Sequence, residues 1–302
     1  MTEPAAIPAA SGPSGWRRLR AHLTDLGGGL QVRRLLPAAA QRAVGPFVFF
    51  DHFGPVTLAP GADSDVRPHP HIGLATLTWL YEGCLLHRDS LGSAQEIRPG
   101  DVNWMSAGRG IVHSERTPAA LREQPRPLHG LQLWVALPAA LQQGEPHFQH
   151  VAAAQIPLVQ AGSARVQVAV GSAFGATSPV RTAAPTLCLS VRLAAGQPWQ
   201  LPRLAAEQAL YSPSRAITLD GAPLGPGELA VIDQADHVTL LAAEATDVAV
   251  IGGAPLDGPR LLWWNFVATE RALIDAAAER WAADGFEPVP GETERIPLPA
   301  RR

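Results

Sequence analysis

The sequence predicts an all-β protein of two β-barrel domains that ends in a single α-helix. Short β-prone segments, separated by Gly and Pro, recur along the chain at the spacing of about 8–12 residues that is typical of barrels and sandwiches. The second half weakly repeats the pattern of the first half, and only residues 269–285 follow a helical period. A chain of 302 residues also exceeds a typical single domain, which favours two.

The first 45 residues predict a lead-in followed by short strands. Residues 1–15 lack a basic segment followed by an apolar core, so we expect a disordered lead-in and no signal peptide. In residues 16–45, Gly27, Gly28 and Gly29 interrupt the apolar pattern and favour strands with turns over a helix. The arginines of this segment predict a solvated strand face, with a phosphate-binding patch as the alternative.

Residues 16–145 form the first predicted domain. Its β-prone segments include the aromatic run at 47–53, which Gly54 and Pro55 end, and further strands at 72–81, 84–89, 102–105 and 128–137. Residues 54–68 predict a loop, and Gly108 and Gly110 predict a tight turn that leads to His113. His52 lies close to a turn and is interpreted as a hydrogen-bonded structural residue.

Two short motifs in this domain have the spacing of metal ligands on strands. His69-Pro70-His71 and His113-Ser114-Glu115 lie about forty residues apart in apolar surroundings. Residues i and i+2 of a strand point to the same face, so each pair projects together. If both strands face one barrel interior, three imidazoles and a carboxylate converge, and this set suits a divalent transition metal.

Residues 146–285 form the second predicted domain, which echoes the first. Trp199 to Tyr211 has the length of His69 to Tyr81, and Pro226-Gly227 stands where Pro99-Gly100 stands. In this alignment Trp199 and Leu201 replace His69 and His71, and Leu240 and Ala242 replace His113 and Glu115. We therefore expect a second barrel of the same kind without metal ligands.

The end of the chain predicts a helix and a tail. Over residues 269–285, Thr269 or a neighbour can cap the helix and Gly285 can end it. One apolar face is expected, made of Leu273, Ile274, Ala277, Ala278 and Trp281. Residues 286–302 are Pro-rich and are expected to be a poorly ordered tail.

Composition excludes several classes of function. A net charge of −3 provides no basic field for direct nucleic-acid binding. No apolar run reaches the roughly 18–20 residues of a membrane span. Cys84 and Cys188 lack disulfide or metal spacing and are interpreted as small core residues in a cytoplasmic protein.

Several stretches of the first half, taken together, resemble the pirin family of the cupin superfamily. They are FVFFDHFGP at 47–55, HPH at 69–71, HRDSLG at 87–92, PGDVNWMSAGRGIVHSE at 99–115 and HGLQLWVALP at 129–138. The resemblance implies a bicupin with one metal in the N-terminal domain, and a C-terminal helix that packs on that domain.

The same resemblance implies four metal ligands, His69, His71, His113 and Glu115, and favours Fe(II) as the metal. Ligand type alone would also allow zinc, manganese, nickel or copper. The chain departs from the family at Ala75, where pirins often carry a Glu. Ala75 cannot bind a metal, so an additional acid near the metal is not expected here.

The activity implied by the resemblance is that of a quercetin 2,3-dioxygenase, which uses O₂ to cleave a flavonol or a related aromatic enol. Glu115 is then either a ligand or the general base that takes the proton of a substrate hydroxyl. Apolar walls are expected around a flat aromatic substrate. The candidates are Phe50, Phe53, Trp104 and Met105, with barrel core as the alternative interpretation, which we favour for Trp104 and Met105.

The alternative function is a non-enzymatic, iron-dependent redox sensor that binds a transcription factor or a metabolic enzyme. Pirins also occur in that role, and it needs the same four ligands. The region from Arg17 to Arg34, or another surface of the first barrel, would then contact the protein partner. Oxygen consumption during turnover separates the two hypotheses.

Overall fold

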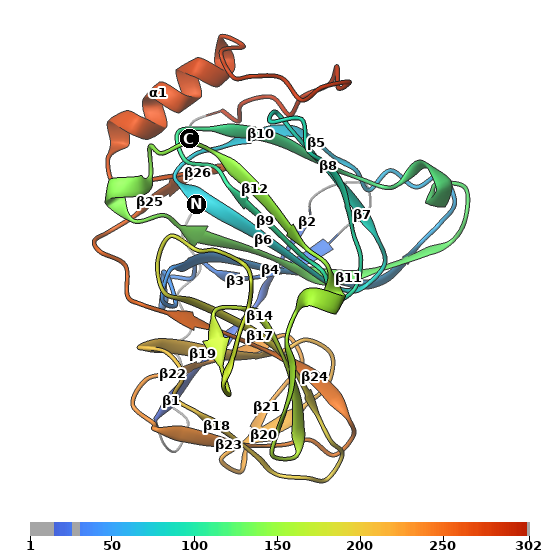
Figure 1. Cartoon of the computed structure of the whole chain (residues 1–302), viewed down its shortest axis with the longest axis vertical. Coiled ribbons are helices and arrows are strands. Elements are labelled where there is room, and N and C mark those ends of the chain that lie inside the picture. The colour runs from blue at the N-terminus through green and yellow to red at the C-terminus, as the bar shows by residue number, and fades with distance from the viewer. Residues whose placement is uncertain (1–14, 26–30, 301–302) are drawn as a thin grey trace, which may run out of the picture. The chain divides into compact units, whose positions relative to one another are not determined.

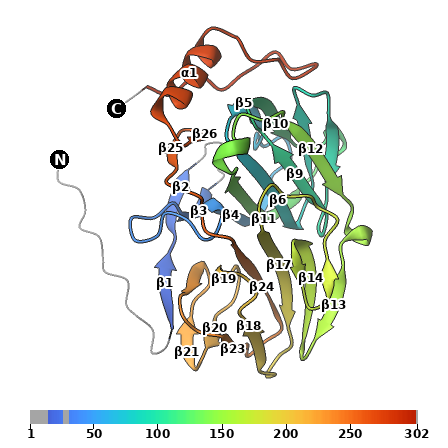
Figure 2. The same cartoon turned by 60° about the vertical axis from the view of Figure 1, so that its left-hand side comes forward.

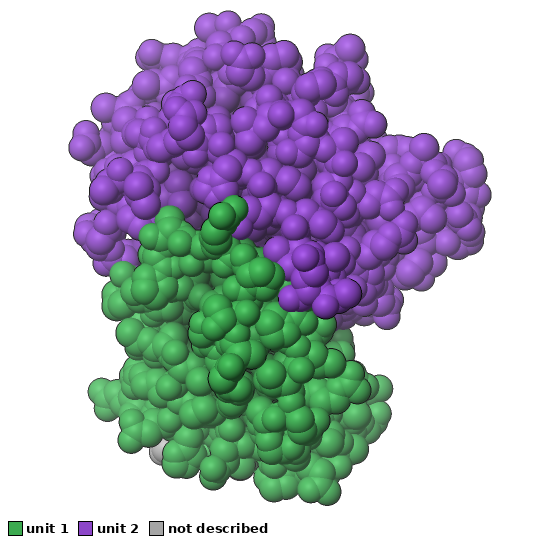
Figure 3. All heavy atoms as spheres, in the orientation of Figure 1, with its two compact units in different colours: residues 1–24, 33–52, 156–255 green, residues 25–32, 53–155, 256–302 purple. Residues whose placement is uncertain are grey.

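The computed structural model describes residues 15–25 and 31–300 and contains two compact units (Figure 3). Unit 1 comprises residues 1–24, 33–52 and 156–255, and unit 2 comprises residues 25–32, 53–155 and 256–302. Each unit thus combines three stretches, whereas the predicted domains were continuous and met at residue 145. The predicted disordered lead-in, residues 1–15, lies outside the described residues except for Gly15.

Unit 2 contains the strands that carry the predicted metal ligands (Figure 1). Its four-stranded antiparallel sheet has the order β5 (Val66–His71), β10 (Ile111–Arg116), β7 (Leu85–Asp89), β8 (Ala94–Ile97). A seven-stranded sheet has the order β12 (His147–Val151), β9 (Val102–Ser106), β6 (Leu74–Glu82), β11 (Arg126–Ala136), β4 (Phe47–Leu58), β3 (Gln31–Leu36), β2 (His22–Asp25). Strands β2, β3 and β4 contain residues of both units.

Unit 1 has the same two-sheet plan (Figure 2). Its large sheet has the order β1 (Trp16–Arg20), β22 (Glu228–Ile232), β19 (Glu207–Ser212), β24 (Thr246–Gly253), β17 (Thr186–Leu193), β14 (Ala164–Val170), β13 (Leu158–Ala161). Its small sheet has the order β18 (Trp199–Pro202), β23 (His237–Leu241), β20 (Ile217–Leu219), β21 (Ala222–Leu224). A short hairpin joins β15 (Ser172–Ala173) to β16 (Ala176–Thr177).

Three 3-10 turns complete the described connections, η1 (Ala119–Leu121), η2 (Ala139–Leu141) and η3 (Ala153–Gln155). Within the part of the chain that the structure describes, no helix combines the length and apolar character that a membrane crossing requires.

The predicted internal repeat is confirmed strand by strand. His69 pairs with His113 between β5 and β10, and Trp199 pairs with Leu240 between β18 and β23. The glycines before β9 and β22, Gly100 and Gly227, both have a positive φ, which glycine adopts without steric cost. The two barrels therefore share one topology and one register.

In unit 1 the positions equivalent to the metal ligands carry apolar side chains. Trp199, Leu201, Leu240 and Ala242 are all buried in a single cluster with residues of the large sheet, such as Val250. The space that a metal site would need is filled by packed hydrocarbon, as the sequence predicts for the second barrel.

The one α-helix among the described residues, α1 (Arg271–Ala282), belongs to unit 2. The predicted apolar face is confirmed, because Ile274, Ala277, Ala278 and Trp281 are buried and Leu273 is partly buried. This face packs against Ile72 and Val112, which flank the metal-ligand positions, and against the hairpin of β25 (Leu261–Trp263) and β26 (Phe266–Ala268). The helix begins after Glu270 without a side-chain cap, so the predicted cap by Thr269 or a neighbour was wrong.

The expectation of a poorly ordered tail was wrong for residues 286–300. Phe286 and Val289 are buried with the helix, and the Ile296 N–H donates to the Pro68 carbonyl on β5 at 2.8 Å. Glu292 accepts hydrogen bonds from Ser114 Oγ at 2.8 Å and from the Arg116 guanidinium. Ser114 and Arg116 alternate along β10 with His113 and Glu115, so the tail binds the opposite face of the ligand strand.

Replacing Glu292 with glutamine should loosen the tail. The substitution removes a carboxylate that pairs with Arg116 and accepts from Ser114, and a hydrogen bond to a charged group contributes about 1.5–3 kcal/mol. We expect trypsin to cleave after Arg295 about tenfold faster or more. Glu294→Gln is the matched control, because that carboxylate also pairs with Arg116 but is exposed. Equal cleavage rates for the two variants would contradict the assigned role of Glu292.

The same contact gives the tail a dependence on pH. The hydrogen bond from Arg116 is the main cause that lowers the pKa of Glu292, and the Ser114 hydroxyl adds to it. A group with a lowered folded pKa stabilises fully above its unfolded pKa, about 4.3, and this stability is lost as the pH falls through the folded value. Tail release, measured by brief pepsin pulses between about pH 3 and 5, should rise at the acid end in the wild type. In Glu292→Gln this step should be absent.

The basic strands near the start have internal partners. Arg17 pairs with Asp233 at 2.6 Å, and Arg34 pairs with Asp51 at 2.7 Å. His52 is buried and lies 2.6 Å from the Tyr211 hydroxyl through Nδ1, which confirms it as a hydrogen-bonded structural residue. Both cysteines are buried and free, as expected for small core residues.

Candidate metal centre

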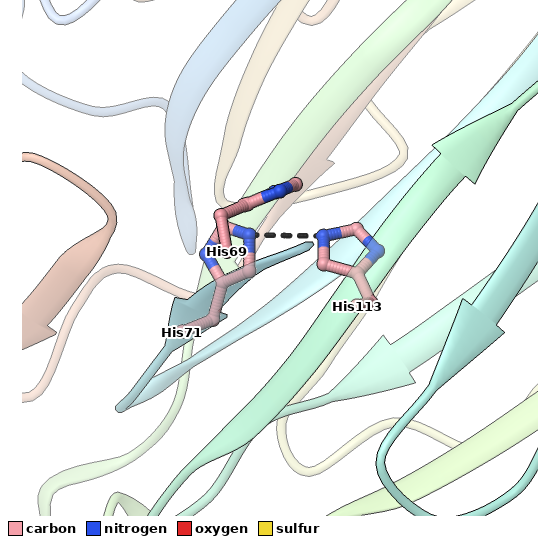
Figure 4. Close-up of side chains that lie close together, drawn as sticks. All are labelled: His69, His71 and His113. Carbon is pink, nitrogen blue, oxygen red and sulfur yellow. Dashed lines mark hydrogen bonds between the residues drawn. The ribbon is translucent and has the colours of Figure 1, made fainter. Parts of the chain in front are cut away.

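Three predicted ligands come from two neighbouring strands of the small sheet in unit 2. His69 and His71 lie on β5, and His113 lies opposite His69 on β10. Because alternate residues of a strand share a face, His69 and His71 project to the same side as His113. Figure 4 shows the three rings turned toward one another. All three side chains are buried.

The three rings bring one nitrogen each to a common point. These nitrogens lie within 4.8 Å of one another, and the ring centroids are 4.4 to 4.9 Å apart. His71 Nε2 and His113 Nε2 are only 3.0 Å apart, the contact drawn as a dashed line in Figure 4. The arrangement therefore presents three imidazole nitrogens to one small volume.

The remaining nitrogens of two of the rings are occupied by backbone carbonyls. His69 Nδ1 donates to the Arg67 carbonyl at 2.8 Å, and His71 Nδ1 donates to the Asn265 carbonyl at 3.1 Å. A carbonyl only accepts, so in both rings the proton resides on Nδ1 and the Nε2 lone pair is free. Hydrogen bonds of this kind orient metal-binding histidines in general.

Burial keeps the three imidazoles neutral at physiological pH. Desolvation lowers the pKa of His69 to about 4, although the Arg67 carbonyl opposes the shift. The pKa values of His71 and His113 are lowered well below the ordinary value, by burial first and by the neighbouring histidines second. Neutral imidazole is the form that binds a metal.

This donor set fits a divalent transition metal. Two Nε2 lone pairs facing each other at 3.0 Å have no proton between them when both Nδ1 atoms carry it, and they repel. A cation between the rings would satisfy both lone pairs and that of His69. Imidazole nitrogen suits zinc, iron, nickel and copper, so the ligands do not choose among these metals.

The fourth predicted ligand, Glu115, stands apart from the three-histidine group. The β5–β10 register shifts between His113 and Glu115, so that Glu115 pairs with Val66 rather than Arg67. A β-bulge of this kind re-aims side chains and is common next to active sites. The Glu115 carboxylate lies 3.4 Å from the Thr78 hydroxyl, and it is not among the atoms that converge within 4.8 Å.

The environment of Glu115 suits a base. The carboxylate is partly buried, and this desolvation raises its pKa above the ordinary value for glutamate, while His87 and the Thr78 hydroxyl offset part of the rise. A raised pKa makes a carboxylate a better proton acceptor near neutral pH.

Other residues around the site were not predicted from the sequence. The Trp134 ring packs edge-on against His71, with centroids 5.2 Å apart. On the far side of His113 lies His87, which stacks on Phe148 and hydrogen-bonds to Asp89. His87 and Asp89 stand two residues apart on a strand, the same alternation that identified the ligands, and this signal could have revealed them.

The four predicted pocket residues all lie in apolar surroundings. Phe50 packs against Tyr211 in unit 1, with centroids 4.8 Å apart. Phe53 belongs to a cluster with Leu80, and Met105 belongs to a cluster with Phe148. Trp104 is among the largest fully buried side chains. Their role in substrate binding stays a prediction.

A cavity of about 230 Å³ lies elsewhere in unit 2. It is lined by Leu58, Leu85, Leu128 and Arg126 among others, and none of the four predicted ligands lines it. The cavity is therefore separate from the histidine cluster.

Two barrels of one topology, one with a buried three-histidine cluster and the other with hydrocarbon at the equivalent positions, define a bicupin. Sequence similarity gives the family. The model of the family Pirin matches residues 29–135, and that of the Pirin C-terminal cupin domain matches residues 188–287.

Relatives support this assignment. The chain is 41% identical to a pirin-like protein of Caulobacter vibrioides, over 90% of this chain and 95% of the relative. It is 35% identical to a protein of Pseudomonas aeruginosa named as a candidate quercetin 2,3-dioxygenase, over 88% of this chain and 83% of that one. The chain belongs to the pirin family.

A solved structure extends the similarity to the whole fold. The crystal structure of quercetin 2,3-dioxygenase from Acinetobacter baumannii superposes with a TM-score of 0.89 at 33% identity, covering 95% of this chain and 96% of that one. This agreement confirms the two-barrel fold that the sequence predicts.

Proposed function

We propose that this protein is a metal-dependent dioxygenase of the quercetin 2,3-dioxygenase type, which cleaves a flavonol or related aromatic enol with O₂. The observation that carries the proposal is the convergence of one ring nitrogen each from His69, His71 and His113 within 4.8 Å. The names of the Pseudomonas and Acinetobacter relatives support the same reaction class.

In this proposal three histidines and Glu115 hold one Fe(II). When bound, the metal would supply open coordination positions and redox chemistry for a substrate oxygen and O₂. The protein fixes the three imidazoles through the Arg67 and Asn265 carbonyls and through the packing around β5 and β10. It also buries the rings away from bulk solvent, and burial strengthens charge interactions.

Glu115 is proposed to bind the metal and to take the proton of the substrate hydroxyl. The bulge after His113 gives this carboxylate a different direction from the histidines. Glu115 would take up the proton, and the substrate would remain as the oxyanion. The Trp134 ring beside His71 is the proposed contact for a flat aromatic substrate.

Oxygen uptake tests the proposal. Fe(II)-loaded wild-type protein mixed with quercetin should consume O₂ in proportion to the substrate lost, as followed with an oxygen electrode and by absorbance. Glu115→Gln should slow the reaction by about 100-fold or more, because a positioned general base contributes about 10²–10⁴. Glu123→Gln, at an exposed glutamate, is the matched control.

Iron that binds without any O₂ uptake would overturn the oxygenase proposal. If a protein partner then bound with an affinity that changed between Fe(II) and Fe(III), the redox-sensor function would replace it. The two functions need the same histidines, so iron binding by itself does not separate them.

A further inference from the structure

A second line of side chains stands behind His113 on the neighbouring strand β7. His113 Nδ1 lies 3.4 Å from His87 Nδ1, and His87 Nε2 lies 3.0 Å from Asp89 Oδ2. The exposed fractions are 1% for His113, 5% for His87 and 0% for Asp89. Buried polar groups in such a row depend on one another for hydrogen bonds.

Strand pairing positions this row. In the antiparallel pair of β7 and β10, His113 stands opposite Asp89 and Glu115 stands opposite His87. His87 and Asp89 are two residues apart, so both side chains project to the same face of β7. The register that assembles the histidine cluster therefore also places this pair next to it.

Asp89 and His87 each make a further contact that fixes their position. Asp89 Oδ1 accepts from the N–H groups of Leu91 and Ser93 at 2.9 and 3.0 Å. The other oxygen, Oδ2, faces His87. The His87 ring stacks on Phe148, with centroids 4.4 Å apart and planes within 8°. The ring is thus confined in its plane, with one nitrogen toward Asp89 and the other toward His113.

The Asp89 carboxylate at the end of the row determines which nitrogen of His87 carries a proton. A carboxylate only accepts, so His87 Nε2 must carry a proton and donate it to Asp89. A His87 ring with its single proton on Nε2 offers a lone pair at Nδ1. In that arrangement His113 Nδ1 donates to His87 Nδ1, and the His113 Nε2 lone pair faces His71 and His69.

We propose that His87 and Asp89 are positioning residues that hold His113 in the tautomer required for metal binding. The inference rests on the metal site of the proposed function, and it does not depend on dioxygenase activity. His69 and His71 receive the same support from backbone carbonyls, which no substitution removes. Among the three histidines, His113 is therefore the one whose metal-binding strength depends on hydrogen bonds from side chains.

The proposal predicts a loss of metal affinity without a loss of fold. His87→Phe keeps a flat ring against Phe148 and removes both hydrogen bonds. Asp89→Asn keeps an oxygen for Leu91 and Ser93 but presents an N–H donor to His87, which reverses the proton order. Both variants should bind Zn²⁺ and Co²⁺ about 10–100-fold more weakly than the wild type, the range typical of such outer contacts.

The experiment is a competition titration of the full chain, stripped of metal, against a chelating dye, with the visible spectrum of the Co²⁺ form as a second readout. His150→Phe is the matched control, because His150 also lies on a strand and hydrogen-bonds through Nδ1 to a side chain, Asn103. The control should keep wild-type affinity and spectrum. Thermal unfolding of the metal-free proteins should show that His87→Phe is still folded at the temperature of the titration, although its midpoint should fall because the buried Asp89 Oδ2 loses its donor.

The outcomes are distinct. An affinity and Co²⁺ spectrum of His87→Phe equal to those of the wild type would overturn the positioning role while leaving the metal site intact. A wild-type protein that binds neither metal ion would overturn the metal site itself, and the proposed function with it. Weaker binding and an altered spectrum in both variants, with the His150→Phe control unchanged, would establish the role.

Discussion

Substituting His113 with alanine should lower the affinity for a divalent metal by about two to three orders of magnitude and abolish oxygen uptake. Structural metal sites with four ligands bind with about 10–16 kcal/mol, so one central ligand accounts for several kcal/mol. His113 is central because its Nε2 lies 3.0 Å from that of His71 and its ring is 4.4 Å from that of His69. The measurement is metal content and affinity, followed by oxygen electrode traces with quercetin.

The stability of the metal-free protein separates ligand loss from misfolding. Without a metal, His113→Ala relieves the contact between two facing lone pairs, but it also leaves a cavity and removes the contact with His87, so the apo protein should stay folded at 25 °C with a lower unfolding temperature. His150→Ala serves as the control, since His150 bonds to Asn103 away from the cluster. Retained metal binding in His113→Ala would show that the three histidines do not form the site.

Substituting Gly73 with alanine should destabilise the metal-binding unit by about 2–5 kcal/mol. Gly73 has a φ of +68°, and an added Cβ would lie 1.9 Å from the Val267 carbonyl oxygen. The left-handed conformation costs about 1–2 kcal/mol for a residue with a Cβ, and overpacking costs a further 1–3 kcal/mol or more. The backbone has little freedom to move, because Gly73 N–H donates to Gly108 and Gly73 C=O accepts from Leu137.

Gly92 offers a matched control for this substitution. Its φ is +87°, and a methyl group added at this position would have no atom within 4 Å, so Gly92→Ala adds backbone strain without a clash. We expect about 1–2 kcal/mol there. Urea unfolding of the metal-free proteins gives both values. Similar losses at the two sites would mean that the contact with Val267 relaxes, and the predicted difference would be wrong.

The local pattern was sufficient to predict most barrel strands and the three histidines, but the predicted loop at 54–68 was wrong at both ends, because β4 continues to Leu58 and β5 begins at Val66. Alternation in a strand is a property of two neighbouring residues, and it places His69 beside His71 whatever the rest of the chain does. The repeat also predicted the apolar positions of the second barrel, because Trp199 and Leu240 pair as His69 and His113 do.

Long-range pairing was beyond the sequence pattern. Trp16 pairs with Ile232, and nothing near Trp16 identifies that partner. The tail was misjudged for the same reason: its Pro-rich composition indicates low order, whereas its partners, Ser114 and Pro68, lie far away in the sequence. Phe50 and Phe53 share one strand, yet they belong to different compact units.

The apolar counterpart of the metal site in the second barrel has a thermodynamic consequence. Trp199, Leu201 and Leu240 occupy the ligand positions in the same register. The second barrel therefore shows the same fold without a metal site. Hydrocarbon there stabilises the fold unconditionally, whereas three buried imidazoles stabilise it only when a cation is bound. Chelation should therefore weaken one barrel and leave the intrinsic stability of the other unchanged. The difference between the free energies of unfolding of the two metal-free barrels would measure how much stability the first barrel loses by carrying a metal site.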